Sequence, residues 1–274
     1  MKNLLISAAV IGGLVGSAGY ASAATNFVVS YEGEAAGVET TTATFSTGGV
    51  ETFDSLATGT SLQSYTTNFG TSGVGSTITG TYAAGGSGIQ INAANEFGGA
   101  GGTGNYAVAF QNTPYSLTLS SDIKGGVNYF GYWLSALDAG NFVTFYNAAG
   151  NVIFTFNPQD VINAVNLSAN PSLYYGNPNG NYAGQDKPEA FIFVNFFDTT
   201  GSFSKISFTE SGTGGYESDN HTVGHYVGMG LGTIIPLPHS IPAAPEPATW
   251  AMLIAGFASL GFLKMRRNRR IAAA

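Results

Sequence analysis

The chain of 274 residues contains no cysteine, which excludes disulfides, thiolate nucleophiles and cysteine-ligated metals. Its net charge is −7, but between residues 24 and 241 only three lysines stand against fifteen acidic residues, so this part carries −12. Because such a charge repels nucleic acid and anionic lipid, we expect no nucleic-acid partner.

Residues 1–23 have the pattern of a secretory signal peptide. A positive charge at Lys2 precedes the apolar run 4–15, and small residues at Ala21 and Ala23 form a cleavage site. The apolar run is too short for a comfortable membrane span. We therefore expect export and removal of this segment by signal peptidase.

The following sequence alternates or is rich in β-branched and aromatic residues, with little helical period, which predicts strands. The first group of strands is expected at 27–31, within 38–52, and at 53–56, 76–82, 88–92, 106–111 and 115–119. A flexible glycine-rich loop is expected at 98–104.

The central block predicts an antiparallel meander, because strands at 129–137, 142–147 and 152–156 are separated by short turn sequences. After it we expect a short helix at 158–164, a long loop at 170–187, a buried strand at 190–197, and further strands at 203–210 and within 216–227. Strands at this spacing predict an all-β fold, an antiparallel β-sandwich that is jelly-roll-like, over residues 24–232.

The C-terminal region begins with a proline-rich segment, 233–244, which predicts an extended spacer. After residues 245–247 come a 16-residue apolar run, 248–263, and a basic block, 264–270. A helix of that length covers roughly 24 Å, less than the ~30 Å hydrocarbon core. The positive-inside rule keeps the basic block in the cytoplasm. The run therefore predicts a hydrophobic helix that anchors the chain temporarily in the inner membrane.

The order of Pro245, Glu246, Pro247, the apolar run and the arginine cluster resembles the PEP-CTERM sorting signal of exopolysaccharide-producing Gram-negative bacteria. The resemblance implies that an exosortase recognises the tail and cuts near the Pro-Glu-Pro motif. It also implies that the protein reaches the cell surface or the extracellular matrix. Residues 129–156 and 217–223 resemble the bodies of one group of PEP-CTERM surface proteins, which implies a fold more than an activity.

The long loop contains the best binding candidates: Tyr174, Tyr175, Tyr182 and Asp186. Tyrosine offers an apolar face beside a polar tip, and this combination suits a sugar ring next to carboxylate or amide groups. The four residues therefore predict a glycan-binding site. The alternative is a loop that is packed by its own tyrosines.

A second set of candidates consists of Glu51, Asp54, Asp219 and Asn220. Their oxygens are hard ligands of the kind that Ca²⁺ prefers. In jelly-roll modules a structural calcium often ties the first strand to the last, and the resemblance extends that possibility to these residues. The alternative is turn chemistry, because Asp and Asn also cap turns through their own side chains.

No motif of catalysis is visible. The body has no nucleophile elbow, and loop 98–104 lacks the Lys-Ser/Thr ending of a phosphate loop. His221 and His225 would lie about 13 Å apart on a strand, which does not favour zinc. We therefore expect a non-enzymatic surface or matrix protein with a structural or adhesive role. The alternative is a glycan-binding module for exopolysaccharide, and a secreted hydrolase is a third hypothesis.

Overall fold

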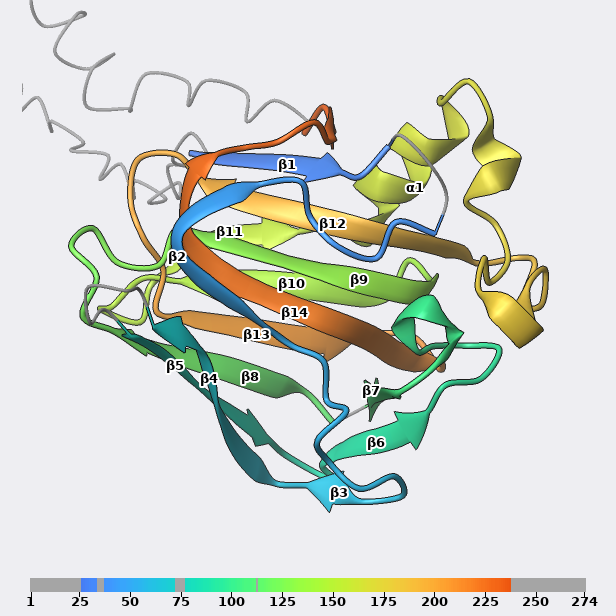
Figure 1. The fold of residues 1–274 in the computed structure, drawn as a ribbon, viewed down its shortest axis with the longest axis horizontal. Coiled ribbons are helices and arrows are strands. Elements are labelled where there is room, and N and C mark those ends of the chain that lie inside the picture. The colour runs from blue at the N-terminus through green and yellow to red at the C-terminus, as the bar shows by residue number, and fades with distance from the viewer. Residues whose placement is uncertain (1–25, 34–36, 72–76, 112, 238–274) are drawn as a thin grey trace, which may run out of the picture. The chain divides into compact units, whose positions relative to one another are not determined.

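The computed structural model describes residues 26–33, 37–71, 77–111 and 113–237. In this part of the chain two antiparallel sheets pack face to face, and the expected all-β sandwich is confirmed (Figure 1). The expected signal peptide, sorting motif and apolar run lie outside the described residues. Within the described ranges, no helix has both the length and the hydropathy to cross a bilayer.

The first sheet contains nine described strands. They are β1 (Phe27–Tyr31), β2 (Thr44–Glu51), β3 (Ser61–Leu62), β6 (Ile89–Ala93), β7 (Asn105–Phe110), β9 (Tyr129–Leu137), β12 (Ala190–Asp198), β14 (Gly215–Gly228) and β15 (Thr233–Ile234). Their order is β15-β1-β12-β9-β14-β7-β6-β3. The long strand β14 pairs with β9 along one edge, and along the other it pairs first with β7 and then with β2.

The second sheet contains six described strands. They are β4 (Ser64–Thr71), β5 (Thr77–Ala84), β8 (Tyr115–Ser121), β10 (Asn141–Tyr146), β11 (Val152–Phe156) and β13 (Lys205–Glu210), in the order β11-β10-β13-β8-β5-β4. Between the sheets lies an aromatic core. The ring centroids of Phe130 and Phe208 are 5.6 Å apart, and those of Phe145 and Phe196 are 5.2 Å apart.

Two strands of the first sheet, β9 and β12, are buried on both faces. Their inner side chains join the aromatic core, while Trp133, Phe191 and Phe193 form a second cluster on the outer face, against which Ala100 packs. Ala100 begins the short 3-10 helix η1 (Ala100–Gly102). The glycine-rich loop therefore covers part of the outer face of the sheet.

The connections depart from the expected meander. The strands β9 and β10 belong to different sheets, and only β10 and β11 form a hairpin. The physical reason is that β9 pairs with β12 on one edge and with β14 on the other, so it has no free edge for β10. Residues 53–56 form a turn rather than the expected strand, and β4 was not expected.

The helix α1 (Pro158–Asn166) begins where the sequence predicted and extends two residues further. Asn157 caps it, accepting a hydrogen bond of 3.0 Å from the backbone N–H of Gln159. The loop after α1 contains two further 3-10 helices, η2 (Pro171–Leu173) and η3 (Gly180–Tyr182). It is bound to the loop that contains η1, because Asn177 Nδ2 donates to Asn95 O at 3.1 Å.

The sandwich extends into the segment where a proline-rich spacer was expected. The strand β15 pairs with β1, and the backbone N–H of Ile235 donates to Val29 O at 2.9 Å. The side chain of Ile235 is buried, and Leu237 packs against the core. Residues 233–237 therefore complete the sheet, and the rest of the expected spacer lies outside the described residues.

Candidate functional site

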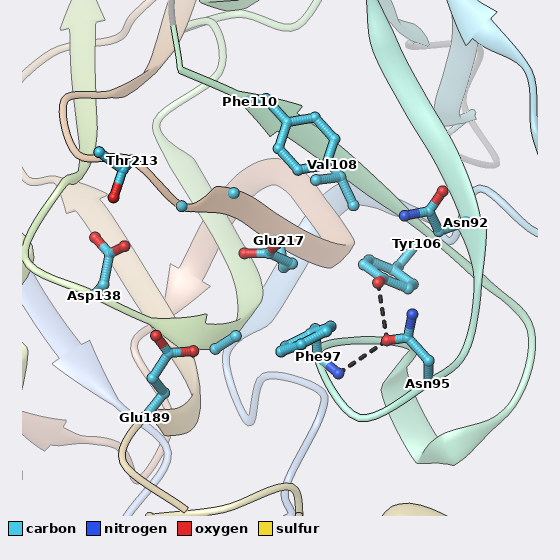
Figure 2. Close-up of a pocket in the computed structure, with 13 residues that line it drawn as sticks. Asn92, Asn95, Phe97, Tyr106, Val108, Phe110, Asp138, Glu189, Thr213 and Glu217 are labelled. Carbon is cyan, nitrogen blue, oxygen red and sulfur yellow. Dashed lines mark hydrogen bonds between the residues drawn. The ribbon is translucent and has the colours of Figure 1, made fainter. Parts of the chain in front are cut away.

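A pocket of about 440 Å³ opens on the first sheet where β7, β9 and β14 meet the covering loops (Figure 2). Its lining contains aromatic side chains, asparagine amides and three carboxylates. Figure 2 shows Glu217 in the middle, with Phe97, Tyr106 and Phe110 to one side and the acidic residues to the other. The pocket therefore has an apolar and an acidic side.

The aromatic side has two phenyl rings that solvent can reach. Phe97 in the η1 loop is 43% exposed and Phe110 at the end of β7 is 41% exposed. Tyr106 on β7 lies between these two residues in the sequence and is buried. Its hydroxyl donates to Asn95 Oδ1 at 3.0 Å. Burial raises the pKa of Tyr106 to about 12, so this hydroxyl stays neutral. Exposed aromatic rings at the rim of a pocket are typical of a binding surface.

The acidic side is centred on Glu217 of β14, which lies between Val108 of β7 and Ser135 of β9 in the sheet. Its side chain is only 8% exposed. Burial raises the pKa of Glu217 to about 8, and repulsion from Glu189 and Asp138 adds to the effect. This carboxyl group is therefore largely protonated at neutral pH.

Glu189 comes from the end of the long loop, directly before β12. The pKa of Glu189 is raised to about 8. Burial is the largest cause, and the interaction with Asp186 and the repulsion from Asp138 act in the same direction. The pKa of Glu210 on β13 is also raised, first by burial, although its carboxylate accepts hydrogen bonds from Asn141 Nδ2 and from the backbone of the next turn. Asp138, Glu189 and Glu217 thus bring acidic groups from three parts of the chain to one pocket, where burial and mutual repulsion disfavour ionisation of the two glutamates.

Glycines make room for these carboxylates. A Cβ atom on Gly215 would collide with Glu217 Oε1, and one on Gly140 would collide with Glu210 Oε1. A Cβ on Gly214 would lie 3.0 Å from Asp138 Oδ2. The acidic side chains therefore lie directly against backbone at positions where a Cβ atom would displace them.

The tyrosines of the predicted glycan site lie elsewhere. Tyr174 is buried, and its hydroxyl donates to Gly33 O at 2.9 Å. The hydroxyl groups of the other two also have partners in the protein: Tyr175 donates to Asn166 Oδ1 at 2.9 Å, and Tyr182 donates to Ala94 O at 2.8 Å. Tyr174 thus has no exposed face on which a sugar could stack. Asp186 lies near the pocket through its hydrogen bond with Glu189.

The four predicted calcium ligands lie close together but bind protein groups. The charges of Glu51 and Asp54 both act on Asp219, whose pKa is raised to about 7, mainly by burial. The hydrogen bonds run from the Phe53 backbone to Glu51 (2.7 Å), from the Asn105 backbone to Asp54 (2.8 Å), from the Ala100 backbone to Asp219 (2.9 Å) and from Asn220 Nδ2 to Glu39 O (2.9 Å). Among the described residues, no three His, Cys, Asp or Glu side chains are arranged to hold a metal. Calcium stays a prediction, which melting with and without a chelator tests.

His221 and His225 both bond to groups of the fold. His221 is fully buried, with Nδ1 3.0 Å from the Tyr82 hydroxyl and Nε2 3.0 Å from Ser218 Oγ. His225 Nδ1 lies 2.7 Å from Gly126 O. Both residues therefore have hydrogen-bond partners within the protein.

Sequence reasoning missed the pocket residues. Phe97, Asp138, Glu189 and Glu217 are far apart in the chain, and no spacing links them. The one signal in the sequence was Phe97, because a large apolar residue inside a polar, glycine-rich segment indicates a ring that is not part of a strand pattern. Comparisons of the chain with family models, with curated proteins and with solved structures each gave no match.

Proposed function

We propose that the protein is an exported, non-enzymatic surface or matrix protein whose sandwich binds glycan in this pocket. The observation that carries the proposal is the pair of exposed phenyl rings, Phe97 and Phe110, facing hydrogen-bonding groups across one cavity. A sugar ring has an apolar face and polar edges, and such a pocket complements both. The alternative of the sequence analysis, a glycan-binding module, is therefore favoured over a purely structural role.

The acidic groups support binding through hydrogen bonds. A carboxyl group that is protonated at neutral pH can donate a hydrogen bond as well as accept one, and sugar hydroxyls need both. The pKa values of Glu189 and Glu217, both about 8, give the pocket two such groups. The amide of Asn92 also lines the cavity and offers a donor and an acceptor.

The same pair argues against hydrolysis. Glycosidases use two carboxyl groups in different states, one protonated and one ionised, because their environments push the two pKa values apart. Glu189 and Glu217 have pKa values raised to a similar level. Glu189 and Glu217 therefore lack the divergence of pKa values that marks the acid and base of a glycosidase, and we propose binding rather than hydrolysis.

The export part of the proposal rests on the sequence. The N-terminal pattern leads the chain to signal peptidase, and the Pro245–Pro247 motif leads it to an exosortase. In this scheme the chain passes through the inner membrane and is released to the surface or the matrix. Its ligand there is the exopolysaccharide of the cell.

A glycan array with the purified full-length chain tests the proposal. We expect selective binding, which Phe97→Ala or Phe110→Ala weakens about tenfold or more, since each loses an aromatic contact with the sugar. The matched control is Tyr175→Ala, an aromatic residue of the other candidate site, which should retain binding. Absence of selective binding to any glycan, or loss of binding in Tyr175→Ala alone, would show that the pocket is not the glycan site.

A further inference from the structure

In the described part of the chain, the acidic groups of the pocket have no cationic partner in its lining. The charges that act on Glu217 are all carboxylates, and the same is true of Glu189. The three lysines of the body, Lys124, Lys187 and Lys205, do not line the cavity. Lys205 lies over the ring of Tyr146 in the second sheet, 5.4 Å from its centroid. Among the residues that the structure describes, none therefore supplies a positive charge to the lining of this pocket.

Glu217 is the most constrained of these acids. The residue as a whole is only 8% exposed, yet its side chain points into the pocket between the rings and the other acids (Figure 2). The hydrogen bond that its carboxylate accepts comes from its own backbone N–H. Glu210 differs, because Asn141 Nδ2 donates to it at 2.7 Å. Burial with so few donors favours the protonated form of this carboxyl group, and a cationic donor from a ligand would stabilise its ionised form.

We propose that the glycan bound in this pocket carries a free amino group, so that the ligand is a polymer of de-N-acetylated amino sugar. This inference rests on the glycan binding proposed above. An ammonium group donates three hydrogen bonds and pairs with Glu217 and its acidic neighbours. The faces of Phe97 and Phe110 attract cations as well as the apolar face of a sugar.

Other ligands complement the pocket less well. A uronic acid would bring a further negative charge to a pocket whose acidic groups already disfavour one another's ionisation. A neutral sugar would leave Glu217 without a cation. A protein ligand could pair a lysine side chain with the acidic groups. The narrow alkyl chain of lysine would cover little of the two phenyl rings, which lie on separate elements. The net charge of −12 on the body also draws cationic polymers towards the protein.

Ionisation gives the proposal a distinctive signature. With pKa values of about 8, Glu189 and Glu217 are largely protonated at pH 7 in the absence of ligand. A ligand that arrives as an ammonium ion favours the ionised form of these carboxyl groups, so its binding releases protons to the buffer, whereas a neutral sugar releases none. Three other acids face this pair: Asp138, Asp186 and Glu210. Their negative charges oppose the ionisation of Glu189 or Glu217.

The test compares two ligands that differ only in acetylation: the β-1,4-linked glucosamine hexamer and its fully N-acetylated counterpart. Binding is measured by calorimetry with the full-length chain at about 150 mM salt. At this salt concentration charges are screened beyond about 8 Å, so long-range attraction contributes little. We expect the glucosamine hexamer to bind at least about tenfold more tightly, with proton release that appears as a dependence of the heat on the buffer. Glu217→Gln should remove the preference, and Glu189→Gln serves as a second variant if the first does not fold.

The control is Asp122→Asn, which removes one negative charge from an exposed position outside the pocket and should keep the preference. Equal affinity for the two hexamers overturns the amino-sugar inference while glycan binding stands. An equal loss in Asp122→Asn and Glu217→Gln means that the attraction is general. Binding of hexalysine without either hexamer points to a protein ligand, and binding of no glycan at all refutes both proposals.

Discussion

Gly215 leaves the space of its missing side chain to the carboxylate of Glu217, two residues further along β14. The backbone of Gly215 does not have a positive φ, so the requirement for glycine at this position is one of space and not of conformation. The position of the central acid in the pocket therefore depends on a neighbour that has no side chain.

Gly215→Ala tests this relationship. We expect it to displace the Glu217 carboxylate, to weaken ligand binding and to lower the free energy of unfolding by about 1–3 kcal/mol through overpacking. Gly85→Ala is the matched control, because a Cβ at that position meets nothing within 4 Å. Denaturant melts and calorimetry measure the two effects. Equal behaviour of the two variants would contradict the close approach.

The acidic pocket predicts that the folded state loses stability as pH rises. The pKa of Glu217 is about 8 in the folded protein, against 4.5 as its ordinary value. A raised pKa gives stability that is complete below the ordinary value and is lost as pH rises through the folded value. Between pH 5 and pH 9 we expect a loss on the order of a few kcal/mol from this group.

Glu217→Gln isolates this contribution, because the variant keeps the shape of the side chain and cannot ionise. Thermal melts at pH 5, 7 and 9 should fall less steeply for the variant than for the wild type. Asp122→Asn should follow the wild-type slope, apart from its small effect on the net charge. Parallel slopes for the wild type and Glu217→Gln would mean that this carboxyl group ionises normally.

The buried His221 predicts that the folded state also loses stability as pH falls, which is the opposite pH dependence to that of Glu217. Burial lowers its pKa to about 3, so its stabilising effect is present above the ordinary value near 6.5 and is lost as pH falls towards 3. His221→Leu also leaves the Tyr82 hydroxyl and Ser218 without this partner, and we expect a cost of about 2–4 kcal/mol. His225→Leu, which removes a half-buried histidine with one bond to the backbone, should cost less. Urea melts at pH 7 and pH 4 measure the free energy of unfolding of His221→Leu, His225→Leu and the wild type.

The sorting tail is tested separately from the sandwich. Replacement of Pro245, Glu246 and Pro247 by alanine should leave the chain in the inner membrane with its C-terminus intact. Mass spectrometry of the mature protein after cell fractionation measures both properties. Pro242→Ala, a change in the expected spacer, should be processed as the wild type is. Release of the triple variant at the normal rate would rule out the exosortase scheme.

Strands were predictable where the local pattern is strong. β1, β9 and β11 have the bounds that their aromatic and β-branched runs predicted, because turn residues delimit each run. β4 was missed because its sequence is mostly Ser, Thr and Asn, and its strand conformation depends on pairing with β5. Pairing partners were not predictable either, since the choice of edge for β9 is made by distant strands.

The sequence by itself determined the all-β class, the lack of thiol chemistry, the acidity of the body and the pattern of the two termini. These are properties of composition and of local order. Only the tertiary structure decided where the pocket lies, because Phe97, Glu189 and Glu217 meet through the pairing of β14 with β7 and β9 and through the loops that cover them. Burial, which composition does not show, then sets the ionisation of these acids and hence the chemistry of the pocket.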